Sequence, residues 1–341
     1  MERNIKRGIL AGGNWIIDNL KVIDIFPGEE RLANILEEST SNGGAPFNLL
    51  KALYQLEVAI PLEAIGVIGD DNMGIDILQE CRNMKINTSQ MTIVKGVRTS
   101  YTDVMTVAET GRRTFFHYRG ANALLDETHF DFSISDAKIF HLGYLLLLDK
   151  LDTIGEGGLT GAAKVLKRAK ELNFITSADI VSEESERFKE IIPVSLKFID
   201  ILFINDFEIK MLTGIKIFDD QGKLLVVNGY KAAKIILDLG VNKWVIIHFP
   251  KGVLALNKKG IKIFQPSVNI PNEKIKGTVG AGDALAAGVL SGVHEGWSMK
   301  KSILLGVSVA AASLMDITSC NGITSLSKCM QIGKSFGYNE C

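Results

Sequence analysis

Residues 277–288 read Gly-Thr-Val-Gly-Ala-Gly-Asp-Ala-Leu-Ala-Ala-Gly, a glycine turn that runs into a helix-forming segment. Three glycines within six residues let the backbone adopt positive φ and approach a ligand closely. The small apolar residues that follow at helical spacing predict a helix beginning near Ala281. The free N–H groups at such a helix start, together with the helix dipole, form a binding site for an anion.

Asp283 is the unexpected member of this segment, because a carboxylate in an anion site repels the anion. It has a purpose if it accepts a proton from a hydroxyl while the N–H groups of residues 281–283 hold charge on the group being transferred. The alternative is an ordinary helix N-cap, for which aspartate is well suited. Spacing alone leaves both interpretations open.

Composition places the chain among ordinary globular enzymes. Its 341 residues are 46% hydrophobic and 23% charged, which suits one large domain or a large domain with an appendage. The net charge of −1 gives no indication of nucleic-acid or membrane partners. The four cysteines lack metal-binding spacing, so we expect reduced thiols and a cytoplasmic protein. Residues 1–15 contain no signal-peptide run, and the longest apolar stretch, residues 144–148, is too short to cross a bilayer.

A second glycine turn comes near the amino end of the chain. Gly43 and Gly44 precede a proline and a series of leucines at helical spacing, which predicts a helix from about residue 45. Asn48 would lie one turn into this helix, on the same side as the glycine turn, where it could contact the same ligand. Asn14 and Asp18 follow a short strand that ends in glycines, and they are either ligands for hydroxyl groups or turn residues.

Residues 94–119 have a different character. Residues 99–107 alternate and are β-branched, residues 112–119 are aromatic and basic, and a Glu-Thr-Gly turn separates them, which predicts a β-hairpin. One face is too polar for the centre of a parallel sheet, so we expect a small β lid that also includes residues 22–26. We interpret Arg112 and Arg113 as a solvated hairpin edge, and we expect Arg119 to point toward a substrate.

From about residue 137, strands and helices alternate, which predicts an α/β fold with a doubly wound, mainly parallel sheet. Ligands of such sheets lie beyond the carboxyl ends of the strands. Asn205 and Glu208, three apart at a helix start, suit Mg²⁺ held through water, although a capping asparagine with an acidic first turn fits equally well. The other polar residues expected at this edge are Asp179, Lys251 and Asp283.

Three motifs in this order resemble the ribokinase/PfkB family of carbohydrate kinases, over nearly the whole chain. Residues 277–283 resemble the family signature Asp-Thr-x-Gly-Ala-Gly-Asp, residues 43–48 its glycine pair and following asparagine, and residues 205–208 its Asn-x-x-Glu motif. The resemblance implies a ribokinase-like fold with a small β-sheet lid. It also implies ATP-dependent phosphorylation, with Mg²⁺, of a fructose-, ribose- or sugar-acid-like hydroxyl.

The resemblance implies roles for individual residues as well. The main nucleotide- and substrate-binding domain would comprise residues 1–13, 44–93 and 123–341, and the lid residues 14–43 and 94–122, through which a homodimer is expected. The implied site residues are Asp283 as base with Gly280, Ala281 and Gly282; Asn14, Asp18, Gly43, Gly44, Asn48 and Arg119 for the sugar; Asn205, Lys251, Gly252, Thr278 and Asn321 for the nucleotide; and Glu208, with Asn205 through water, for the metal.

The chain departs from the family pattern at Gly277, where the family usually has an aspartate. In many relatives that acidic residue belongs to a monovalent-cation site. We therefore expect weak or absent activation by K⁺. Residues 177–179 and 248–252 also differ from the sequences that are more common in the family.

Other classes of protein fit the sequence less well. A dinucleotide-dependent oxidoreductase requires GxGxxG after the first strand, where this chain has Gly12-Gly13-Asn14. A P-loop kinase requires GxxxxGK[ST], and this motif is absent from the sequence. Two alternatives stay open. One is a nucleoside kinase of the same fold, and the other is a non-catalytic sugar-binding regulator, which would be expected to have lost Asp283.

Overall fold

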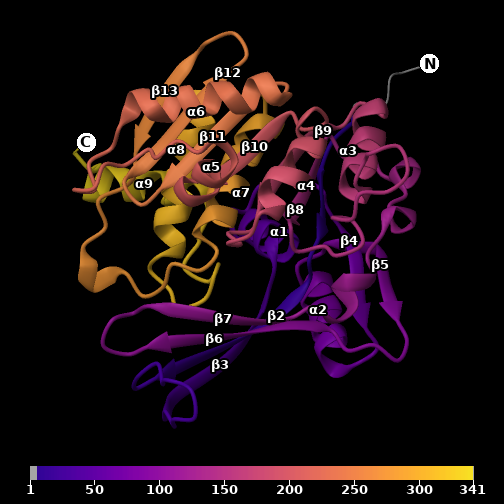
Figure 1. The fold of residues 1–341 in the computed structure, drawn as a ribbon, viewed down its shortest axis with the longest axis horizontal. Coiled ribbons are helices and arrows are strands. Elements are labelled where there is room, and N and C mark those ends of the chain that lie inside the picture. Colours follow the sequence, from indigo (N-terminus) through magenta and orange to yellow (C-terminus); the bar gives the residue numbers. More distant parts are fainter. Residues whose placement is uncertain (1–5, 341) are drawn as a thin grey trace.

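The computed structural model describes residues 6–340. Cys341 and the first five residues, part of the segment without a signal-peptide run, lie outside the described residues; the other three cysteines are buried and unpaired. Two β-sheets dominate the structure, and Figure 1 shows the smaller sheet below the larger one. The larger sheet has nine strands in the order β13-β12-β11-β10-β9-β8-β1-β4-β5. Their bounds are β1 Ile9–Gly13, β4 Leu62–Gly69, β5 Asn87–Val94, β8 Ile139–Leu145, β9 Ile175–Ile180, β10 Ile201–Asn205, β11 Trp244–Phe249, β12 Gly252–Asn257 and β13 Lys262–Pro266.

All neighbouring strands from β11 to β5 are parallel, whereas β12 and β13 extend the sheet in antiparallel fashion. Strands such as β10 are near-continuous apolar runs because helices cover both faces of the sheet, so neither face is left to water. The prediction of a doubly wound, mainly parallel α/β sheet is confirmed. The carboxyl ends of these strands therefore meet at one edge, where ligands of such sheets bind.

Two hydrophobic clusters hold the helices against the sheet. Helices α3, α4 and α6 pack on one face, and α1, α7 and α8 on the other. Within residues 6–340, no helix combines the length and the hydrophobicity needed to cross a membrane. The helix bounds are α1 Ala45–Gln55, α2 Asn72–Asn83, α3 Gly161–Glu171, α4 Arg187–Leu196, α5 Asp206–Thr213, α6 Val226–Leu239, α7 Ala281–His294, α8 Met299–Ser313 and α9 Leu326–Phe336.

The small sheet has four strands in the order β3-β2-β6-β7. They are β2 Ile16–Ile23, β3 Ile35–Gly43, β6 Ser100–Val107 and β7 Arg113–Tyr118. Strands β6 and β7 form the antiparallel hairpin that the alternating pattern predicted. Strand β3 was not predicted, because its polar, largely exposed sequence lacks the usual strand pattern.

The structure excludes one alternative for Asp18 and corrects one boundary. Asp18 lies within β2, paired with β3 on one side and β6 on the other, and not in a turn. The lid segment was expected to begin at Val94, but Val94 is the last residue of β5, at the edge of the large sheet. Strands β2 and β5 form their hydrogen bonds with other strands of the chain. The spacing of residues within each segment therefore does not predict which sheet the segment joins.

Candidate active site

Helix α7 begins as the glycine pattern predicted, at Ala281. Gly280 precedes it with φ 76°, in the left-handed region, and a Cβ at this position would lie 2.4 Å from the Cβ of Ser319. Only glycine fits both constraints. The N–H of Ala281 makes one long contact, 3.5 Å to the Thr278 carbonyl, and the first N–H groups of any helix lack intrahelical partners. The turn therefore presents backbone donors to an anion.

Asp283 lies in the first turn of α7 and is not a helix cap, because Gly280 holds the N-cap position and no side chain caps this helix. Its carboxylate is buried and accepts hydrogen bonds from Asn48 Nδ2 at 2.8 Å and from the Tyr144 hydroxyl at 2.7 and 2.8 Å. Asn48 is itself oriented, since its Oδ1 accepts from Ser319 Oγ at 2.7 Å. Burial raises the pKa of Asp283 to about 6, and the two hydrogen-bond donors act in the opposite direction.

A cavity of about 410 Å³ lies in front of Asp283. Asn14 is fully buried at its wall: its Oδ1 accepts from the N–H of Tyr144 at 2.9 Å, while its Nδ2 has no partner. A buried amide donor without a partner is costly, so it marks a place where a ligand oxygen fits. Asp18 also lines the cavity, and burial, with the nearby Asp283 charge, raises its pKa to about 7.

The small sheet contributes one wall of this cavity through Thr102, Phe115 and His117. Thr102 Oγ1 and His117 Nδ1 are 2.8 Å apart on directly opposite residues of β6 and β7, and His117 Nε2 is buried without a partner. Burial and the Arg119 charge lower the pKa of His117 to about 4, so the ring is neutral at neutral pH. Sequence analysis missed these residues and Tyr144; polar residues recurring on one face of the hairpin were the available signal.

Asn205 and Glu208 form a capping box at the start of α5 and also line the cavity. The capping interpretation is confirmed, and a role in holding Mg²⁺ stays a prediction. Glu208 Oε2 accepts from the Asn205 backbone N–H at 2.8 Å, and Oε1 accepts from Asn205 Nδ2 and Ser182 Oγ, each at 2.7 Å. Burial raises the pKa of Glu208 to about 7. Burial and the nearby charge of Glu208 also raise the pKa of Asp179.

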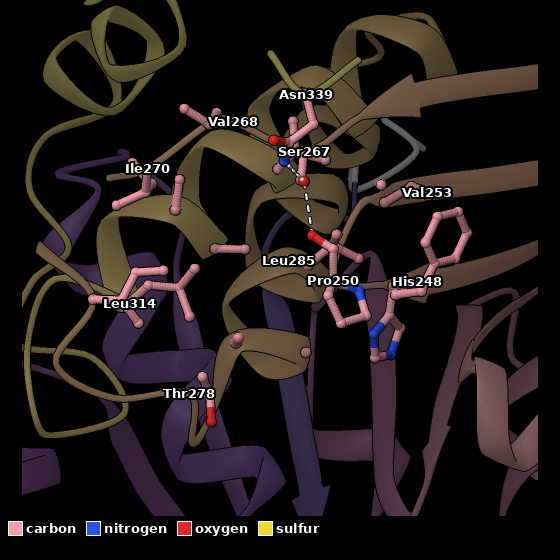
Figure 2. A pocket seen from close by; sticks show the side chains of 18 of the residues that line it. His248, Pro250, Val253, Ser267, Val268, Ile270, Thr278, Leu285, Leu314 and Asn339 are labelled. Atoms are coloured by element: carbon pink, nitrogen blue, oxygen red, sulfur yellow. Dashed lines mark hydrogen bonds between the residues drawn. The ribbon is translucent and has the colours of Figure 1, made fainter. Parts of the chain in front are cut away.

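A second cavity, of about 520 Å³, lies on the other side of the α7 start (Figure 2). Its wall is largely apolar, and Figure 2 shows Val268, Ile270 and Leu314 lining it. Its polar part includes Ser267, which donates to the Pro250 carbonyl at 2.8 Å and accepts from Asn339 Nδ2 at 2.7 Å. The two cavities share lining residues and therefore meet at the helix start; the shared residues are Asn205, His248, Thr278, Ala281 and Gly282.

Most residues expected in the site line one of these cavities, and four do not. Arg119 lies 3.4 Å from Asp149 and 3.9 Å from Glu183, and these contacts hold its guanidinium outside the cavity lining. Gly43 ends β3 opposite Ile16, behind the lining. The remaining two, Lys251 and Asn321, are exposed residues outside the lining of both cavities.

Both the carboxyl-end edge of a doubly wound sheet and the start of a helix are places where such folds bind nucleotides and other anionic ligands. The model of the pfkB family of carbohydrate kinases matches residues 15–325, and the chain belongs to this family. The family is one of phosphotransferases that act on carbohydrates, and this chain is accordingly a carbohydrate kinase.

Known relatives agree with this membership. Probable fructokinase-6, chloroplastic, of Arabidopsis thaliana is 29% identical over 291 residues, covering 83% of this chain and 69% of the relative. The structure of ribokinase from Thermotoga maritima has a TM-score of 0.76 at 22% identity and covers 96% of this chain and 99% of that one. Arabidopsis thaliana ribokinase complexed with ribose and ATP has a TM-score of 0.77 at 20% identity, with 96% and 98% covered. At these identities the structural likeness shows the fold alone.

Proposed function

We propose that this chain transfers the γ-phosphoryl group of ATP to a hydroxyl of a small uncharged sugar, with Asp283 as the base. The observation that carries the proposal is the position of the Asp283 carboxylate. It is buried in the first turn of α7, where the two cavities meet. In this proposal the cavity of about 410 Å³ in front of Asp283 is the sugar-side cavity, and the cavity of about 520 Å³ is the nucleotide-side cavity. A carboxylate there reaches the acceptor hydroxyl while the helix-start N–H groups face the phosphate.

In the proposed reaction, the sugar hydroxyl oxygen attacks the γ-phosphorus. The bond between that phosphorus and the bridging oxygen breaks, ADP leaves with this oxygen, and the hydroxyl proton passes to Asp283. Backbone N–H groups of residues 281–283 hold the charge on the phosphoryl oxygens. The raised pKa of Asp283, about 6, makes it a better proton acceptor than an ordinary aspartate while keeping it ionised at neutral pH.

Mg²⁺ fits the donor set beside this site. Mg²⁺ retains several waters and needs only one or two protein carboxylates besides the substrate phosphates. Within residues 6–340, no cluster of three or more His, Cys, Asp or Glu side chains could hold a metal ion alone. Glu208, with Asn205 through water, and Asp179 would hold the ion, which would neutralise charge on the phosphates.

The charges around the sugar-side cavity favour an uncharged substrate. Four carboxylates line it, those of Asp18, Asp179, Glu208 and Asp283, and no Lys or Arg of the described chain is among its lining residues. Asp283 is ionised at neutral pH, and a sugar acid would bring a second anion next to it, with repulsion that a low-dielectric cavity strengthens. A fructose- or ribose-like polyol instead offers hydroxyl groups that donate to carboxylates and accept from Asn14 Nδ2.

The small sheet supports a role as a lid over the main domain. The lid would comprise residues 14–43 and 94–122, except Val94, which ends β5 of the large sheet. Closure of such a lid would exclude water, which competes for the phosphoryl group. Exposed apolar side chains on the small sheet include Ile35, Leu36, Phe116 and Tyr118. An apolar surface on an open sheet suits pairing with a second copy, so the proposed assembly is a homodimer through the lids.

A panel of neutral sugars, sugar acids and nucleosides, assayed for ADP release, tests the substrate proposal. The expected result is turnover of a neutral ketose or pentose at least tenfold above any sugar acid, since one unfavourable charge is worth about this much or more. If a nucleoside is turned over faster than every sugar, the substrate is a nucleoside and the proposal of a sugar substrate is wrong. Binding of a sugar without ADP release from any compound would indicate the non-catalytic regulator.

A further inference from the structure

A further cavity lies between helix α6 and the antiparallel hairpin of β12 and β13. It is an open groove of about 550 Å³, and it shares no lining residue with the two cavities that meet at the start of α7. Figure 1 shows α6 lying across these two strands at the top of the view, at the opposite end of the molecule from the small sheet. The proposed phosphotransfer does not use this groove.

Lysine is the most frequent residue in the lining of the groove, and no aspartate or glutamate within residues 6–340 is part of that lining. Two lysines come from α6 and three from the turn after β12 and from β13; they are Lys231, Lys234, Lys258, Lys259 and Lys262, and together they define what we call the lysine groove. All five are exposed, and of the five only Lys234 forms an ion pair in the described chain, with Asp238. Like charges in one groove repel one another, so an anionic partner would be stabilised there.

Both walls of the lysine groove are held in place by contacts within the protein. On the hairpin side, Asn257 Oδ1 accepts hydrogen bonds from the backbone N–H groups of Lys259 at 3.0 Å and of Ile261 at 2.8 Å. On the helix side, Gly229 allows α6 to pack closely on β12, because a Cβ there would lie 2.3 Å from Leu254 Cδ1. A groove whose walls are already ordered loses little conformational entropy when a partner binds.

The side chains of the groove favour carboxylates over phosphates or nucleic-acid bases. The lining contains no arginine of the described chain, and arginine is the residue that pairs with two phosphate oxygens at once. The ring of Tyr230 is not free to stack on a base, since Lys262 Nζ lies 5.1 Å from its centroid. Val227, which is 80% exposed, and Leu256 offer apolar contact beside the ammonium groups. An anion that also carries apolar side chains fits this combination.

Protection of a sheet edge explains the lysines only in part. Lysine on an edge strand keeps that strand from pairing with another chain. Because β13 is the last strand of the large sheet, this explanation suits Lys262. It does not account for Lys231 and Lys234, which lie on α6 and line the same groove.

We propose that the lysine groove is a docking site for an acidic segment of a partner protein, in which carboxylate side chains alternate with apolar ones. The carboxylates would pair with the lysines of both walls, and an apolar side chain would contact Val227. The partner would then be bound away from the cavities at the start of α7, so that the protein could be held by the partner while its active site stays accessible. This inference does not depend on the proposed phosphotransfer.

The test measures, by fluorescence anisotropy, how the full-length protein binds a labelled peptide of repeated Glu-Glu-Leu. Replacing one lysine on each wall, in the double variant Lys231→Glu and Lys258→Glu, should weaken binding about tenfold or more, because two attractive contacts become repulsive. The matched control is Lys300→Glu with Lys334→Glu, which makes the same change in net charge at exposed lysines of α8 and α9 that line none of the three cavities. The control should bind the peptide as the wild type does, and added NaCl should weaken binding.

Three outcomes would overturn the proposal. The first is a wild-type protein that shows no saturable binding of the peptide, and the second is an equal affinity of the groove variant and its control. The third is binding to a poly(dT) oligonucleotide or to phosphatidylserine vesicles that depends on the groove lysines and is tighter than binding to the peptide. Both variants should retain the turnover of the wild type. A wild-type protein that turns over no sugar or nucleoside would overturn the proposed phosphotransfer, and the peptide measurement would still decide the role of the groove.

Discussion

The hydroxyl of Tyr144 lies 2.7 and 2.8 Å from the two carboxylate oxygens of Asp283. The Tyr144 hydroxyl donates a hydrogen bond to the proposed base. The substrate hydroxyl that accepts the phosphoryl group must also bind this carboxylate, either beside the Tyr144 hydroxyl or in its place. Tyr144 is itself held by its backbone N–H, which donates to Asn14 Oδ1 at 2.9 Å. The carboxylate of Asp283, the proposed base, is thus oriented by the protein itself.

Tyr144→Phe should move the pH dependence of kcat/KM. Asp283 acts as a base only when ionised, so activity falls as pH falls through its pKa of about 6. Burial disfavours the ionised form of Asp283, and the hydrogen bonds from Tyr144 and Asn48 stabilise it; the charge of Asp283 in turn raises the pKa values of Asp18 and Asp179, which face the same site. Removing the hydroxyl should therefore raise the pKa and shift the acidic limb to higher pH. Pre-steady-state and steady-state rates across the weakly acid range measure the shift.

The control for this prediction is Tyr230→Phe, which changes a tyrosine on α6 that lines neither the sugar-side nor the nucleotide-side cavity and should leave the profile unchanged. An acidic limb of Tyr144→Phe that coincides with that of the wild type would show that Tyr144 does not act through Asp283.

Asp283→Asn should lower kcat by roughly 10²–10⁴-fold, the usual scale for a positioned base. Asparagine keeps the shape but neither carries the charge nor accepts the proton. The KM for ATP should change little, because the backbone N–H groups at the α7 start remain. Steady-state kinetics on the folded variant measure both constants, with the exposed Asp238→Asn as control. Near-normal turnover would remove Asp283 from the mechanism.

Potassium should activate the enzyme weakly or not at all. Gly277 provides no carboxylate for a cation, and the guanidinium of Arg113 already lies beside this position, with Nη2 3.4 Å from where a Cβ would be. Two cations in one small site repel each other. Rates measured in KCl and in choline chloride at equal ionic strength should coincide. A several-fold rise specific to K⁺ would contradict the prediction.

Phe116→Glu should prevent self-association through the lid. Phe116 is half-exposed on β7, and a charge buried in an apolar interface carries a large desolvation cost. Light scattering should report a dimer for the wild type and a monomer for the variant. Ile75→Glu, a change at an exposed apolar residue on α2, should leave the dimer intact. A wild-type protein that is monomeric at every accessible concentration would exclude the proposed assembly.

Local sequence carried enough information for the elements and for part of the site. Apolar runs predicted the parallel strands, since strands covered on both faces must be apolar. Glycine and proline placed the starts of α1 and α7, because they restrict or widen the backbone conformations at single residues. The β6–β7 hairpin followed from alternation and a turn. Strand β3 was not predicted, because its pairing with β2 determines its register and its own sequence has no strand pattern.

The sequence by itself determined the family motifs, the sheet class and Asp283 as the candidate base, since each depends on residues close together in the chain. Only the tertiary structure decided which side chains surround that base. Tyr144 and Asn48 reach Asp283 across 139 and 235 residues, and Arg113 reaches Thr278 across 165. Such contacts depend on the order in which crossovers place the strands, and on a second sheet folding over the first, and neither leaves a periodic signal in the residues concerned.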